Sequence, residues 1–133
     1  MAKVTAEAHP SEGRRIVFSA RTRSFVNVRE QREVGAIGFT SGEMLLMALG
    51  NCTLGTVMES SLVSEAAVDR MTISLDAPAV RNPTRLPAAK VVIELATDDP
   101  ALKRKDAALT QLTSTCPIAN TVSGAMDLIS RCR

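Results

Sequence analysis

The chain has 133 residues and a formal net charge of +2 at pH 7, and it is 45% hydrophobic but only 2% aromatic, without Trp or Tyr. This length predicts one domain over residues 1–133 with a substantial core. The small charge and the scarcity of aromatic side chains argue against nucleic-acid binding. The three cysteines lack zinc-site spacing, so we expect no metal and no cofactor.

The N-terminus has no apolar run of signal-peptide length, and no segment is long and apolar enough to cross a membrane. We therefore expect a cytoplasmic protein without membrane contact. Thiols are kept reduced in that compartment, so the cysteines are not a disulfide framework.

The first third of the chain predicts strands. Apolar and polar residues alternate over residues 4–8 and 15–18, and residues 25–28 give a third extended run. A turn signal at residues 10–13 separates the first two. Residues 31–39 contain two glycines and read as a loop.

A long helix is predicted to follow. The segment Thr40-Ser-Gly-Glu43 fits a capping box, in which the Thr hydroxyl and the Glu carboxylate each accept from the other residue's N–H. We expect about 24 helical residues from here to near Ser64. Residues 44–57 are apolar on almost every side, which is typical of a buried central helix.

The remaining pattern alternates between sheet and helix. Residues 71–76 and 90–95 predict strands, with a proline-rich loop over residues 78–87. Asp98-Asp-Pro100 starts a helix with an apolar stripe. A short helix opens at Cys116-Pro117 and stops at Gly124, and residues 126–132 predict a closing strand. This order indicates the α+β class.

Two cysteines, Cys52 and Cys116, are the most informative residues. Cys52 lies inside the apolar helix, whereas Cys116 precedes Pro117 at a helix start, where the helix N-terminus favours an anion. A thiolate is the nucleophile in cysteine chemistry, and its sulfenic acid can condense with a second thiol. The pair indicates peroxide chemistry, although both could instead be small buried hydrophobes. Cys132 is expected to be a bystander.

These residues resemble two motifs of the OsmC/Ohr family, the osmotically inducible and organic hydroperoxide resistance proteins. The segment EMLLMALGNCT at residues 43–53 is similar to the family's reactive-Cys helix, and CPIANT at residues 116–121 is similar to its Cys-Pro motif. The resemblance covers nearly the whole chain. It implies an OsmC-like fold, with antiparallel strands wrapped around long buried central helices in an intertwined homodimer.

The resemblance also implies a thiol-dependent peroxidase for organic hydroperoxides. In that reading Cys52 is peroxidatic and Cys116 resolving, and the two form a disulfide. The active sites lie at the subunit interface. Dihydrolipoyl groups recharge the Ohr branch, so the implied partner is a dithiol reductant of that kind. Two other functions stay open: an apolar-ligand binding module and a redox sensor.

The family's Glu and Arg are less certain in this chain. Glu43 is nine residues before Cys52, as in the OsmC-like branch, which on a regular helix places it half a turn away and roughly 13 Å along the axis. It could hold an Arg or serve only as a cap. The activating Arg comes from the N-terminal strands in the family, and Arg14 and Arg15 are the candidates here. Arg21 and Arg23 are rivals.

Overall fold

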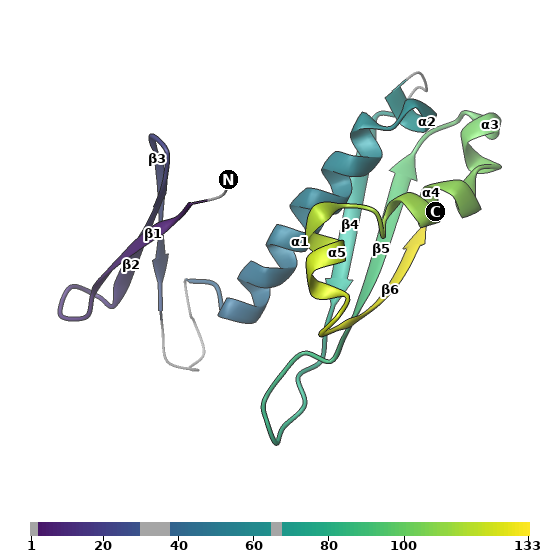
Figure 1. Ribbon diagram of the computed structural model, residues 1–133. Helices are drawn as coiled ribbons and strands as arrows, with labels where there is room; N and C mark the ends of the chain where they lie inside the picture. Colours follow the sequence, from purple (N-terminus) through teal and green to yellow (C-terminus); the bar gives the residue numbers. More distant parts are fainter. Residues whose placement is uncertain (1–2, 30–37, 65–67) are drawn as a thin grey trace. The chain divides into compact units, whose positions relative to one another are not determined.

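The computed structural model describes residues 3–29, 38–64 and 68–133 (Figure 1). The chain forms two compact units, Met1–Met44 and Leu45–Arg133, and each is described by itself. Most of the loop expected over residues 31–39 lies outside the described residues. That the whole chain acts as a single domain stays a prediction.

The N-terminal unit is a three-stranded antiparallel sheet in the order β1 (Thr5–His9), β2 (Arg15–Ala20) and β3 (Arg23–Val28). All three strands agree with the sequence pattern. Phe18 pairs across the sheet with Phe25, and their rings stack with centroids 5.4 Å apart. The β1–β2 turn brings Gly13 and Arg14 to positive φ angles of 70° and 55°. A left-handed backbone conformation is normal for glycine but costly for arginine. The turn therefore holds Arg14 in a backbone conformation that an isolated arginine rarely adopts.

Helix α1 (Ser41–Glu59) begins with the predicted capping box. Thr40 Oγ1 accepts from the Glu43 N–H at 3.1 Å, and Glu43 Oε1 accepts from the Thr40 N–H at 2.9 Å. The prediction of a single helix of about 24 residues is correct at the start of the helix but wrong at its end. α1 has 19 residues, and a separate helix α2 (Ser61–Ser64) follows. The break occurs because Ser60 Oγ caps the second segment, accepting the Leu62 N–H at 3.1 Å.

The second unit contains a sheet in the order β4 (Arg70–Asp76), β5 (Ala88–Ala96) and β6 (Asp127–Cys132). β4 and β5 are antiparallel, but β6 runs parallel to β5. The expectation of antiparallel strands is therefore wrong for this pair. Helices occupy the connection between β5 and β6, which is the kind of crossover that parallel pairing needs.

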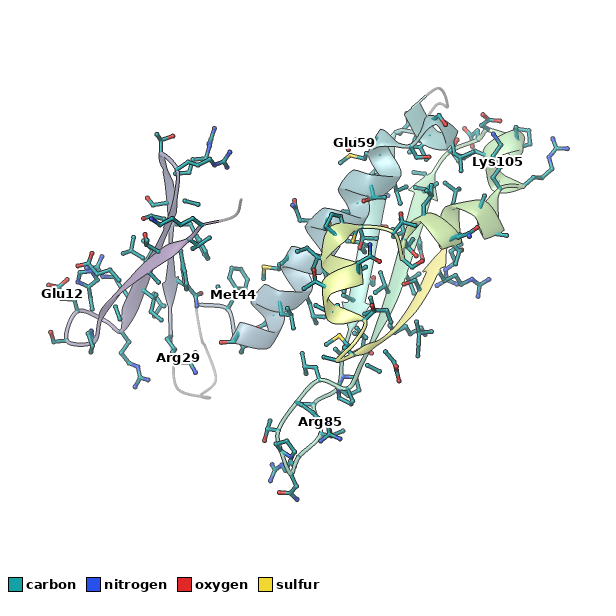
Figure 2. The ribbon with its side chains drawn as sticks, in the orientation of Figure 1. Glu12, Arg29, Met44, Glu59, Arg85 and Lys105 are labelled. Carbon is teal, nitrogen blue, oxygen red and sulfur yellow. The ribbon has the colours of Figure 1, made fainter. Side chains whose placement is uncertain are left out.

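These connecting helices are α3 (Pro100–Lys103), α4 (Asp106–Leu112) and α5 (Pro117–Val122). Asp99 caps α3 as predicted, accepting the Ala101 N–H at 2.9 Å. The sequence predicted one helix where α3 and α4 are two. Lys105, labelled in Figure 2, lies at their junction, and its N–H bonds to the Leu102 carbonyl three residues back, which tightens and ends the first helix.

The helices and the inner face of the second sheet enclose the core of this unit. α1 packs on β4 and β5 through Leu49, Gly50, Thr53 and Val57, and α5 lies beside it (Figure 1). A Cβ at Gly50 would be 3.0 Å from Leu75 Cδ1, so the glycine permits close contact with β4.

The opposite side of α1 differs from the expected buried helix. Leu45, Met47 and Met58 are 39%, 45% and 55% exposed. Within the described residues of the second unit, the sheet and the other helices therefore leave these apolar side chains of α1 exposed. No helix among the described residues has both the length and the hydropathy of a membrane span.

Candidate functional site

Cys52 and Cys116 lie in one apolar cluster of the second unit. Cys116 is the N-cap of α5 and has an exposed fraction of 0%. Its Sγ accepts the Ala119 N–H at 3.3 Å. Cys52 is partly exposed on α1 and packs against the same cluster. The chain thus brings together a shielded sulfur and one that solvent can reach.

The two thiols lie close enough to influence each other's pKa. Burial raises the pKa of Cys52, and its contact with Cys116 raises it further, while the Ile118 N–H acts in the opposite direction. Of the two thiols, Cys52 therefore holds its proton more strongly.

Cys116 has the opposite electrostatic balance. Burial would raise its pKa, but hydrogen bonds from the Ala119 N–H, Cys52, Thr53 and the Ile118 N–H together lower it below the ordinary thiol value. Donors aimed at a sulfur favour its charged form. The N-cap position expected from the Cys-Pro sequence therefore favours the anion.

Thr53 is a third polar member of this site. It is fully buried, its hydroxyl donates to the Leu49 carbonyl at 2.8 Å, and its Oγ1 lies 3.7 Å from Cys116 Sγ. Sequence reasoning does not identify it. Its position next to Cys52 is the only local signal, and the contact arises when α5 packs against α1.

Glu43 acts as a helix cap in this chain. Its carboxylate bonds to the Thr40 N–H, and hydrogen bonds from the Thr40 backbone and side chain lower the pKa of Glu43. The cap is one of the two roles considered for this residue. A catalytic role for Glu43 stays a prediction.

Arg14 and Arg15 belong to the N-terminal unit, where they line a cavity of about 410 Å³ together with Arg29 and apolar residues of β1 and β2. Arg15 Nη2 forms an ion pair with Glu12 at 2.7 Å. Arg14 Nε donates to the Arg29 carbonyl at 2.9 Å. The two candidates thus share one cavity but differ in their partners, and activation of Cys52 by either stays a prediction.

Cys132 is buried in the other core cluster, with Val57 and Leu109, rather than beside the thiol pair. Burial, with a smaller effect of the Asp106 charge, raises the pKa of Cys132 to about 11. A thiol with this pKa stays protonated near neutral pH and is a poor nucleophile.

Solved structures show the same fold at low sequence identity. An OsmC-like protein from Mycoplasma pneumoniae matches with a TM-score of 0.77 and 16% identity, over 100% of this chain and 96% of its own. The organic hydroperoxide resistance protein OhrB of Bacillus subtilis matches with a TM-score of 0.68 and 14% identity, over 100% and 98% of the two chains.

A third structure is described as an organic hydroperoxide resistance protein OsmC and predicted redox protein from Legionella pneumophila. It has a TM-score of 0.68 and 12% identity, over 96% of this chain and 93% of that one. No curated protein sequence is significantly similar to this chain. A family profile described as OsmC-like protein matches residues 34–130, a range that includes both Cys52 and Cys116. The chain therefore belongs to the OsmC-like protein family.

Proposed function

We propose that this protein is a thiol-dependent peroxidase that reduces organic hydroperoxides. The observation that carries the proposal is the packing of Cys52 and Cys116 in one cluster, where a partly exposed thiol lies beside a fully buried one whose hydrogen bonds lower its pKa. Family membership and similarity to proteins described as organic hydroperoxide resistance proteins support the same chemistry.

Cys52 is the attacking residue in this proposal because solvent and substrate can reach it. Its sulfur attacks the outer oxygen of ROOH, a S–O bond forms and the O–O bond breaks. The thiol proton moves through Cys116 to the leaving alkoxide, so the products are Cys52 sulfenic acid and ROH. Cys116 is again a thiolate at the end of this step.

Cys116 then resolves the intermediate. Its thiolate attacks the Cys52 sulfenic sulfur, forming the disulfide and releasing hydroxide. An external dithiol donates two electrons and two protons: one proton restores the Cys52 thiol and the other converts hydroxide to water. The net reaction consumes one hydroperoxide and one dithiol and yields an alcohol, water and an oxidised dithiol.

Because the two cysteines have different roles in this proposal, their substitution should have different effects on turnover. Cys52→Ser should abolish reduction of tert-butyl hydroperoxide with a dihydrolipoyl dithiol. Cys116→Ser should allow one turnover, slowed because the proton carrier is lost, and then stall. Cys132→Ala is the matched control and should retain turnover, because Cys132 lies in a separate cluster.

Mass spectrometry after mild oxidation should find a Cys52–Cys116 disulfide in the parent and sulfinic acid on Cys52 in the Cys116 variant. Full turnover by Cys52→Ser would refute the proposal. Stoichiometric oxidation of the parent without turnover would instead favour a redox sensor, and inertness would favour a binding module.

The surface near Cys52 predicts a preference for apolar peroxides. Leu45 and Cys52 are seven residues apart on α1, so they share a helix face, and Leu45 is 39% exposed. Burying an alkyl group contributes about 0.8 kcal/mol per CH₂, nearly fourfold in affinity. We expect kcat/KM for cumene or tert-butyl hydroperoxide at least ~10-fold above that for hydrogen peroxide.

Steady-state kinetics with one reductant would measure this ratio. Leu45→Ala should reduce the rate with cumene hydroperoxide more than the rate with hydrogen peroxide. Equal use of the two peroxides by the parent would contradict the apolar approach, even if the thiol mechanism were retained.

A further inference from the structure

We propose that Thr53 is a positioning residue of the thiol pair, whose hydroxyl turns from the Leu49 carbonyl to the Cys116 sulfur when that sulfur loses its proton. Thr53 would thereby stabilise the Cys116 thiolate. The inference deepens the proposed function, since it concerns the same two thiols.

The geometry allows such a turn. A hydroxyl has one proton to donate and lone pairs that accept. In the present arrangement Thr53 Oγ1 donates to the Leu49 carbonyl at 2.8 Å and lies 3.7 Å from Cys116 Sγ, at a distance suited to a sulfur hydrogen bond in which either atom can be the donor. With Cys116 as a thiol, Thr53 accepts its S–H. With Cys116 as a thiolate, rotation about the Cβ–Oγ1 bond redirects the Thr53 proton to sulfur.

The surroundings make this donor important. Cys116, Leu49, Val91 and Ala119 form a buried apolar cluster, and Cys52 is the titratable group that faces Cys116 in the described part of the chain. A buried charge is costly unless hydrogen bonds replace its solvation. The Ala119 and Ile118 N–H groups are fixed backbone donors, so Thr53 is the buried side-chain donor outside the reacting pair.

Thr56 offers a matched control. Its hydroxyl also donates to the carbonyl four residues back, that of Cys52 at 3.0 Å. It thus reproduces the helical hydrogen bond of Thr53 one turn later. Thr53 differs from Thr56 in its contact with the Cys116 sulfur and in being fully buried.

The test is a thiolate titration without peroxide. In a Cys52→Ser background, absorbance near 240 nm would be followed from about pH 5 to about pH 10, below the pKa of about 11 for Cys132. The absence of Tyr and Trp keeps this region of the spectrum clear. We expect Thr53→Val to lower the thiolate fraction about 10-fold at a pH below the midpoint, since a hydrogen bond to a charged group is lost.

Thr53→Ser should keep the parent's titration because it keeps the hydroxyl, and Thr56→Val should also leave it unchanged. Coincident curves for Thr53→Val and Thr53→Ser would overturn the inference, as would an equal shift from Thr56→Val. Should Thr53→Val not fold by circular dichroism, Thr53→Ala provides the same comparison with Thr53→Ser. The titration measures no turnover, so its result is independent of the peroxidase assay. The protein could lack peroxidase activity and still show the Thr53 effect, or have the activity and not show the effect.

Discussion

The three cysteines show how the surroundings of one kind of side chain determine its proton affinity. Hydrogen-bond donors overcome burial at Cys116 and lower its pKa, whereas burial dominates at Cys52 and at Cys132. Burial alone therefore does not make a thiol inert. What distinguishes Cys116 is its N-cap position, which directs the Ala119 N–H at the sulfur.

Cys132 makes a stability prediction with a defined sign. Its folded-state pKa is about 11, against an ordinary value of 9.0. Between these values the unfolded chain loses the Cys132 proton and the folded chain keeps it, so the stabilising effect is complete below the lower value and is lost as pH rises. We expect the free energy of unfolding to fall by roughly 2 kcal/mol more in the parent than in Cys132→Ala between about pH 9 and about pH 11.

Urea unfolding followed by far-UV circular dichroism, under reducing conditions, would measure this difference. Cys132→Ala also loses packing, which lowers its free energy of unfolding by the same amount at every pH. This loss cancels when the change in free energy between two pH values is compared in the two proteins. The other ionisable side chains are the same in both proteins, so their contributions cancel. Parallel dependence on pH in the two proteins would show that the raised pKa is wrong.

Among the elements, α1 connects the local signals to the site. The Thr40–Glu43 box begins the helix, Ser60 ends it, and Leu49, Thr53 and Val57 occupy its buried face. Cys52 lies next to Thr53 at the margin of that face, which explains why it contacts the core and is still partly exposed.

Two glycines of α1 give a matched comparison. A Cβ at Gly50 would lie 3.0 Å from Leu75 Cδ1, whereas a Cβ at Gly55 would have no atom of the described residues within 4 Å. Replacing a helical glycine by alanine gains about 1 kcal/mol of helix propensity. We expect Gly55→Ala to stabilise by about that amount and Gly50→Ala to be roughly 1–2 kcal/mol less stable than Gly55→Ala because of the contact with Leu75.

Urea unfolding of the two variants would measure the difference. Equal stabilisation by both alanines would mean that β4 adjusts at no cost. A destabilising Gly55→Ala would indicate that another chain packs against this side of α1, which bears on the assembly.

At the scale of the whole molecule, the exposed face of α1 predicts self-association. Met47 and Met58 are apolar and exposed on one face of α1, and a symmetry mate would cover them. We expect an obligate homodimer. Met47→Glu should weaken association at least ~10-fold, because a charge in an apolar interface loses its hydration without a partner.

Ile129→Glu is the control for this prediction. Ile129 is an apolar residue that is 64% exposed, like the residues of the α1 face. It lies on β6, an end strand of its sheet, and not on α1. Analytical ultracentrifugation should show a dimer for the parent and for the Ile129 variant. A folded monomeric parent at micromolar concentration would contradict the dimer.

The local features of the fold could be read from the amino-acid sequence. The capping residues Thr40, Glu43 and Asp99 bond within three positions of themselves, so their partners are known without the fold. The sequence likewise predicted each of the six strands of the described residues, three of them from alternation of apolar and polar residues, and the Cys-Pro pair marked the start of α5. The family followed from motifs rather than from any physical calculation, and the Cys52–Cys116 disulfide that the resemblance implies stays a prediction.

Tertiary structure decided what depends on segments far apart in the chain. The parallel pairing of β6 with β5 and the contact of Thr53 with Cys116, 63 positions away, arise only when α5 packs between distant elements. Local sequence indicated that the N-cap position of Cys116 favours an anion. It could not indicate that the pKa of Cys52 is raised, because that depends on burial and on a Cys116 neighbour supplied by packing. Residue type and spacing determined where reactive sulfurs could be, and their long-range neighbours determined how each sulfur holds its proton.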